Sequence, residues 1–214
     1  QIMYRLALLI IMFLTSQLNA QTETKTNTNF EKGMTKALAL WESNPADAVN
    51  LFERIASAEP DNWLPPYYAA MVLITGGFSE NNMETVHANL NRAQNFLNDA
   101  TAISKENSEI MVLQAMLHTV YVVKDGAKYG MTLSPKIAKI YEEAYKLSPK
   151  NPRVLLSKTQ WDMGAAKFFG QDTKPFCKDI EKAIELFTNF KPETSLHPKW
   201  GMDGAKKALA ECKL

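Results

Sequence analysis

The stretch that decides the fold runs from residue 45 to residue 60 and reads PADAVNLFERIASAEP. Within it, a small residue, two large apolar residues and a proline follow at spacing i, i+4, i+7 and i+12, in the series Ala48, Phe52, Ile55 and Pro60. This spacing places the apolar side chains on one stripe of an α-helix, and the proline ends the helix where its missing N–H does no harm. The stretch therefore predicts an amphipathic helix that needs a neighbour to cover its stripe.

The same spacing returns three more times along the chain. The later series are Ala93, Leu97, Ala100 and Lys105; Ile137, Tyr141, Ala144 and Pro149; and Ile180, Ile184, Phe187 and Pro192. Such recurrence indicates structural repeats. Apolar segments between the series, at residues 63–75, 108–123 and 152–168, predict partner helices. We therefore predict an all-α protein without a sheet, in which antiparallel helical hairpins stack as about four repeats plus a C-terminal capping helix at residues 198–212.

The series resembles the second helix of the tetratricopeptide repeat, although the repeat here is longer by about ten residues. The extra length falls at residues 76–82, 124–134 and 170–173, which are expected to connect helices. More narrowly, the chain is similar to small exported tetratricopeptide-like proteins of Bacteroidetes bacteria. The stretches that carry this similarity are FERIA at 52–56, WLPPYYAA at 63–70, NPR at 151–153 and HPKWG at 197–201. The resemblance implies a helical repeat fold and an exported protein, and it implies no particular activity.

The first 20 residues have the order of an export signal. Arg5 precedes an apolar run at residues 6–14, and polar residues then lead to Ala20. The run is about half of the roughly 20 residues that span a bilayer, so a permanent anchor is the weaker interpretation. We predict a signal peptide at residues 1–20, a flexible leader at 21–29 and a helical repeat domain at 30–214. The expected location is the periplasm or the medium outside the cell, with no stable membrane anchor after cleavage.

Composition and motifs exclude several classes of function. The formal net charge of +1 over 214 residues gives no basic field for nucleic acid. His87, His118 and His197 share no ligand spacing, so we expect neither a metal site nor a cofactor. No nucleophile stands beside a base and no cofactor motif is present, so the protein is not expected to be an enzyme.

The chain has two cysteines, Cys177 and Cys212. Cys177 lies near the start of one predicted helix and Cys212 near the end of the next, at similar distances from the turn between them. An antiparallel hairpin would place them side by side, and an oxidising compartment would then favour a disulfide. The alternative is that both are small apolar residues of the core.

The first helices of the predicted hairpins are expected to line a concave groove. By helical register, the residues on that side are Tyr67, Met71, Thr75, Val112, Met116, Thr119, Leu156 and Gln160. They are mostly apolar and uncharged, which suits an apolar helix or loop. The main hypothesis is therefore an exported scaffold that binds a protein or peptide partner in this groove. The alternatives are a periplasmic binder of a small molecule or metal, an enzyme whose site the sequence does not reveal, and a groove filled by the protein's own residues.

Overall fold

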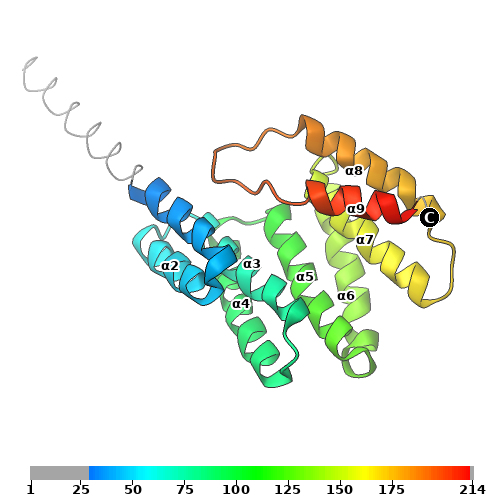
Figure 1. Ribbon diagram of the computed structural model, residues 1–214, viewed down its shortest axis with the longest axis horizontal. Helices are drawn as coiled ribbons and strands as arrows, with labels where there is room; N and C mark the ends of the chain where they lie inside the picture. The colour runs from blue at the N-terminus through cyan, green and yellow to red at the C-terminus, as the bar shows by residue number, and fades with distance from the viewer. Residues whose placement is uncertain (1–28, 213–214) are drawn as a thin grey trace, which may run out of the picture.

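The computed structural model describes residues 29–212, shown in Figure 1. Within this range the chain forms nine α-helices and one short 3-10 helix, and it contains no strand. The predicted all-α class is therefore confirmed for this part of the chain. The predicted signal peptide and leader lie outside the described residues, except for Asn29, which is helical. None of the helices between residues 29 and 212 combines the length and apolar character needed to cross a membrane.

The helices follow one another with short connections. A helical stretch at residues 29–43 precedes α2 (Pro45–Ala58), α3 (Leu64–Ser79), α4 (Met83–Ile103), α5 (Ser108–Lys124), α6 (Gly126–Leu147), α7 (Pro152–Phe168), the 3-10 helix η1 (Lys174–Phe176), α8 (Cys177–Asn189) and α9 (Met202–Cys212). Five helices begin at a side chain that accepts a hydrogen bond from a backbone N–H two or three residues on, namely Asn44, Asn82, Asn107, Asp125 and Asn151. These caps satisfy N–H groups that a helix start leaves without partners, and they fix where each helix begins.

Helices that are adjacent in sequence pack against each other. α3 contacts α4, α5 contacts α6, and α7 contacts α8, while α5 also contacts both α3 and α7 (Figure 1). The first three members of each series lie in α2, α4, α6 and α8, and the first members, Ala48, Ala93, Ile137 and Ile180, are fully buried, while Ile184 and Phe187 of α8 are half-buried. The i, i+4, i+7 spacing therefore identified the buried stripe of each of these helices.

The start of α6 differs from the sequence-based expectation. Residues 124–134 were expected to connect two helices, yet α6 already begins at Gly126 and continues through Pro135. Asp125 caps the helix start, and Leu133 packs against the buried cluster that includes Val112 of α5. Packing against α5 thus outweighs the weak helix propensity of the glycines and the proline in this stretch.

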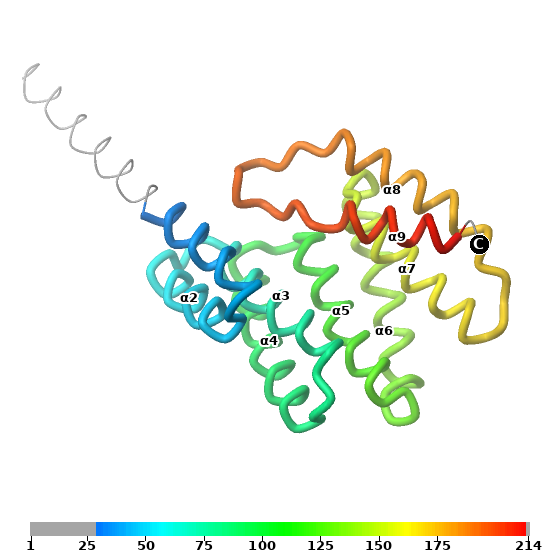
Figure 2. Tube along the Cα trace, viewed as in Figure 1, coloured from blue at the N-terminus to red at the C-terminus, as the bar shows by residue number. Residues whose placement is uncertain are grey.

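Between α8 and α9, residues 190–201 leave the helical layers and fold back toward α3, as Figure 2 shows. We call these residues the return segment. The segment ends at Gly201, whose φ of +114° favours glycine. A Cβ atom on Gly201 would lie 2.5 Å from Cζ of Phe187 in α8. The chain therefore re-enters the helical layers at a point where only glycine fits.

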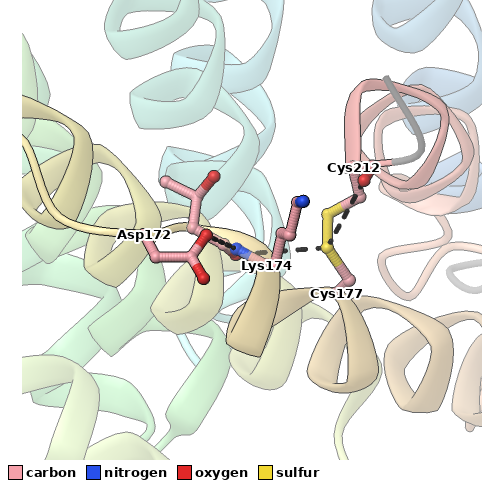
Figure 3. Close-up of a disulfide and its surroundings, with 5 residues drawn as sticks. Asp172, Lys174, Cys177 and Cys212 are labelled. Carbon is pink, nitrogen blue, oxygen red and sulfur yellow. Dashed lines mark hydrogen bonds between the residues drawn. A yellow bond between two sulfur atoms is a disulfide. The ribbon is translucent and has the colours of Figure 1, made fainter.

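The predicted capping helix begins later than expected, at Met202 instead of Pro198, because the residues before it belong to the return segment. α9 packs against α8, with Ala205 and Ala208 buried at the contact. Cys177 at the start of α8 and Cys212 at the end of α9 form a disulfide, shown in Figure 3, and their Cα atoms are 5.8 Å apart. The α8, return segment and α9 unit is thus closed into a covalent loop.

Candidate functional site

The return segment lies against the side of α3 where the sequence predicted a groove. The hydroxyl of Tyr67 accepts a hydrogen bond from Nε1 of Trp200 at 2.9 Å. The hydroxyl of Tyr68 donates to the carbonyl oxygen of Leu196 at 2.7 Å. The rings of Trp63 and His197 meet edge to face with their centres 5.7 Å apart. The chain therefore covers this surface with its own residues.

The eight residues predicted to line the groove are mostly enclosed. Tyr67, Met71, Val112 and Leu156 are buried, Thr75, Met116 and Thr119 are half-buried, and Gln160 is exposed. The hydroxyls of Thr75 and Thr119 donate to carbonyl oxygens of their own helices, at Met71 and Ala115. Met116 packs against the buried clusters of the core. These residues therefore serve core packing, and they do not present one continuous open surface.

A buried ion pair lies close to the same tyrosines. Arg153, at the start of α7, donates to Glu109, at the start of α5, from Nε to Oε2 at 2.8 Å and from Nη2 to Oε1 at 2.7 Å. Nδ2 of Asn151 also donates to Oε1 of Glu109, at 2.6 Å. The guanidinium group of Arg153 lies over the ring of Phe190 in the return segment, with Cζ 4.3 Å from the ring centre. The pair therefore ties two helix starts to the return segment.

The electrostatics of this cluster keep its hydroxyl groups neutral. Burial, together with the negative charge of Glu109, raises the pKa of Tyr67 well above its ordinary value. Burial likewise raises the pKa of Tyr68, although the charge of Arg153 opposes part of this effect. Both hydroxyls therefore stay protonated at physiological pH, and each keeps its role in holding the return segment. We assign the cluster a structural role.

A different group of side chains gathers on the surface where α4, α5 and α6 meet. The rings of His87 in α4 and Tyr121 in α5 lie nearly perpendicular, with their centres 5.6 Å apart. The ring of Tyr129 in α6 lies 5.0 Å from Tyr121 and 6.3 Å from His87. α5 packs against both α4 and α6, and this packing brings the three rings together. All three residues are half-buried, so the group is partly accessible to solvent.

His118 extends this group by one helical turn along α5. Its Nε2 atom lies 3.2 Å from Nε2 of Gln114, and Gln114 exchanges two hydrogen bonds of 2.8 Å with Gln94 of α4. Burial lowers the pKa of His118, and the nearby charge of Lys136 lowers it further. The imidazole is therefore neutral at pH 7, and because the Gln114 amide nitrogen can only donate, Nε2 of His118 accepts this hydrogen bond. We call His87, His118, Tyr121 and Tyr129 together the aromatic–histidine face.

Apolar groups and cations surround the aromatic–histidine face. Val123 and Met131, close in sequence to its two tyrosines, expose 62% and 92% of their surface. Nζ of Lys128 lies over the ring of Tyr129, 4.8 Å from its centre. A hydrogen bond to Tyr129 raises the pKa of Lys128, so this side chain is charged. The arrangement is suited chemically to a flat apolar molecule that carries a negative group at its edge.

No sequence pattern indicated the aromatic–histidine face, because its members come from three helices. Only His118 and Tyr121 lie on one side of the same helix, at spacing i, i+3. That pair is the one local pattern from which part of the face could have been predicted. Among residues 29–212, no group of three or more His, Cys, Asp or Glu side chains is placed to hold a metal ion. The face instead offers histidines among aromatic rings.

The structure is similar to the solved structure of the HusA haemophore from Porphyromonas gingivalis. The TM-score is 0.76, the sequences are 22% identical, and the match covers 86% of this chain and 92% of that chain. Neither a family model nor a curated protein matches the sequence. At this identity, the likeness shows a shared fold. The source of the similar structure, a Bacteroidetes bacterium, agrees with the narrower resemblance found in the sequence.

This likeness corrects the expected function and the expected partner. The main hypothesis, a scaffold that binds a protein or peptide in a groove, is contradicted, because the similar structure is that of a haemophore. The physical reason lies in the return segment, because its Trp200 bonds to Tyr67 and packs against the buried clusters that contain Met71 and Val112. Helical register predicted which residues line that side, and it carried no information on what covers them.

Proposed function

We propose that the protein binds a haem-type ligand on the aromatic–histidine face and acts as a carrier, with no catalytic step of its own. The observation that carries this proposal is the fold shared with a haemophore over most of both chains. The face adds a place of suitable chemistry. Its aromatic rings suit contact with the porphyrin ring of haem, and its neutral imidazole suits the iron. Its neighbouring lysines suit the haem carboxylates.

Each part of the face has a separate task in this proposal. Tyr121 and Tyr129 would supply aromatic contacts to the porphyrin, and because their rings are tilted by 50° to each other, one of them would stack on it and the other would meet it at an angle. His87 and His118 would be the residues that hold the iron, with His118 exchanging its contact with Gln114 for it, because a haem iron needs few protein ligands. Lys128, over the ring of Tyr129, and Lys136, whose charge acts on His118, would supply positive charge to the propionate carboxylates. A free metal ion would need a larger cluster of protein ligands.

Two finer features of the chain belong to the same proposal. The pairs α3–α4, α5–α6 and α7–α8 are tetratricopeptide-like repeat units, which is supported by the recurring sequence series and by the contacts within each pair. The protein is exported after cleavage of a signal peptide, which is supported by the order of charged, apolar and small residues before residue 21. A disulfide such as Cys177–Cys212 is typical of an oxidising compartment outside the cytoplasm.

A haem titration followed by absorbance in the Soret region tests the function. We expect the purified protein to give a saturable Soret shift. The chain has three histidines, so each can be replaced in turn. Replacing His87 and His118 together by alanine is expected to weaken haem binding by at least about tenfold, because the axial ligand is lost. His197→Gln is the matched control, since His197 packs against Trp63 far along the chain from the face, and it should bind haem like the parent.

The two parts of the proposal fail in different ways. If the parent protein shows no saturable Soret change, the function is wrong. If the parent binds haem and the double variant binds equally well, the function stands and the placement on the aromatic–histidine face is wrong. Thermal melts of all variants show whether a loss of binding reflects a loss of fold.

A further inference from the structure

Exposed large apolar side chains gather at one edge of the molecule. α5 and α7 each pack against α6 and are joined to it by short connections, so they run in the same direction and end at the same edge (Figure 1). The exposed apolar residues at these two helix ends and in the first turns of α6 are Val123, Met131, Phe168 and Phe169. We call these four residues the apolar edge. They are exposed and add little to the core, and contact between apolar groups and water is unfavourable.

Phe168 and Phe169 form the most exposed aromatic group of this edge. They expose 83% and 72% of their surface, although large aromatic residues are usually well enclosed. Their rings pack edge to face with centres 5.2 Å apart. α7 ends at Phe168, and Gly170, with a φ of +67°, turns the chain directly afterwards. The two rings therefore project together from the tip of a helix.

Lysines accompany the apolar edge. Lys124, Lys128, Lys167 and Lys174 lie in the same helix ends and turns, together with the acids Asp125 and Asp172. Both carboxylates accept hydrogen bonds from backbone N–H groups, Asp125 from Lys128 and Asp172 from Lys174, and Figure 3 shows the second contact. These six residues carry four positive and two negative formal charges, a sum of +2, while the whole chain has a formal charge of +1.

We propose that the apolar edge docks the protein reversibly on an anionic lipid surface. Aromatic rings on helix tips insert well at the boundary between headgroups and acyl chains, and the lysines beside them pair with lipid phosphates. The apolar groups stand on separate turns and form no continuous flat patch. A fluid lipid surface accommodates such separate projections without the close shape fit that a protein interface needs. This role goes beyond ligand binding, because it concerns association of the protein with a membrane surface.

Co-sedimentation of the full chain with lipid vesicles tests the proposal. The probes are vesicles of phosphatidylcholine alone and vesicles that also contain phosphatidylglycerol. We expect binding to the anionic vesicles, weaker binding in high salt because salt screens the lysines, and little binding to phosphatidylcholine alone. Replacing both phenylalanines, Phe168→Ser with Phe169→Ser, is expected to reduce vesicle affinity by at least about tenfold, because two buried rings are lost.

The chain offers a matched control for this variant. Ile103 and Leu147 are also exposed, at 37% and 44%, and they end α4 and α6 at the opposite edge. Ile103→Ser with Leu147→Ser should bind vesicles like the parent. The proposal is overturned if the parent binds neither kind of vesicle, or if the double phenylalanine variant binds as well as the parent. Self-association without vesicles that disappears in the phenylalanine variant would also overturn it, because the edge would then serve a second copy of the chain.

Discussion

Replacing Glu109 by alanine is expected to lower the free energy of unfolding by about 3–5 kcal/mol, because it leaves a buried charge without its partner. The side chain of Arg153 is 1% exposed, and two of its nitrogens donate to the Glu109 carboxylate. Without that carboxylate, the guanidinium group keeps only the ring of Phe190 beside it. Urea unfolding should therefore show a lower midpoint with an unchanged slope.

A second ion pair between helices provides the control for this prediction. Arg92 of α4 pairs with Glu53 of α2, but their side chains are 41% and 51% exposed. Glu53→Ala is therefore expected to change the free energy of unfolding by at most about 1 kcal/mol. Equal effects of the two substitutions would show that burial does not govern the contribution of Glu109.

Ending the chain after Pro192 is expected to lower the melting temperature strongly and to cause aggregation. The truncation removes Leu196 and Trp200, which hold Tyr68 and Tyr67, and it removes α9 from the buried face of α8. A loss of about 5 kcal/mol is expected from the exposed core and the missing disulfide together, which is a large share of the stability of an ordinary domain. Calorimetry and light scattering measure both effects.

A milder variant separates the disulfide from the packing. Cys177→Ala keeps the return segment and α9 but removes the covalent loop, and it should cost about 2–4 kcal/mol. In the presence of reductant, the parent and this variant should melt alike. A truncated chain as stable and soluble as the parent would show that the return segment and α9 are an appendage.

Local periodicity explains which parts of the fold the sequence could predict. The series that begins at Ala48 predicted α2, and the same spacing predicted the buried stripes of α4, α6 and α8, because a helical stripe depends only on nearby residues. The first turns of α6 were missed, because Gly126, Gly130 and Pro135 favour a loop when packing is unknown. The contact of Tyr68 with Leu196 joins residues 128 positions apart, and no local pattern indicates it.

The candidate site was harder to predict for a related reason. His87, Tyr121 and Tyr129 each lie on a different helix, so their proximity depends on how α4, α5 and α6 pack. The residues of the predicted groove, in contrast, followed from helical register on single helices. The residues that cover them belong to a distant segment, which register does not indicate. The predicted binding surface therefore lies on the side of α3 that the return segment contacts.

Nuclear magnetic resonance of the 15N-labelled protein with ferric haem tests the central claim most directly, because the paramagnetic iron broadens the signals of nearby amides. Binding at the aromatic–histidine face predicts that the amide signals of His87, His118, Tyr121 and Tyr129 broaden at low haem ratios, while those of the return segment, such as Leu196, stay sharp. Broadening centred on the return segment and α3, with the signals of Tyr121 and Tyr129 unchanged, would contradict the account.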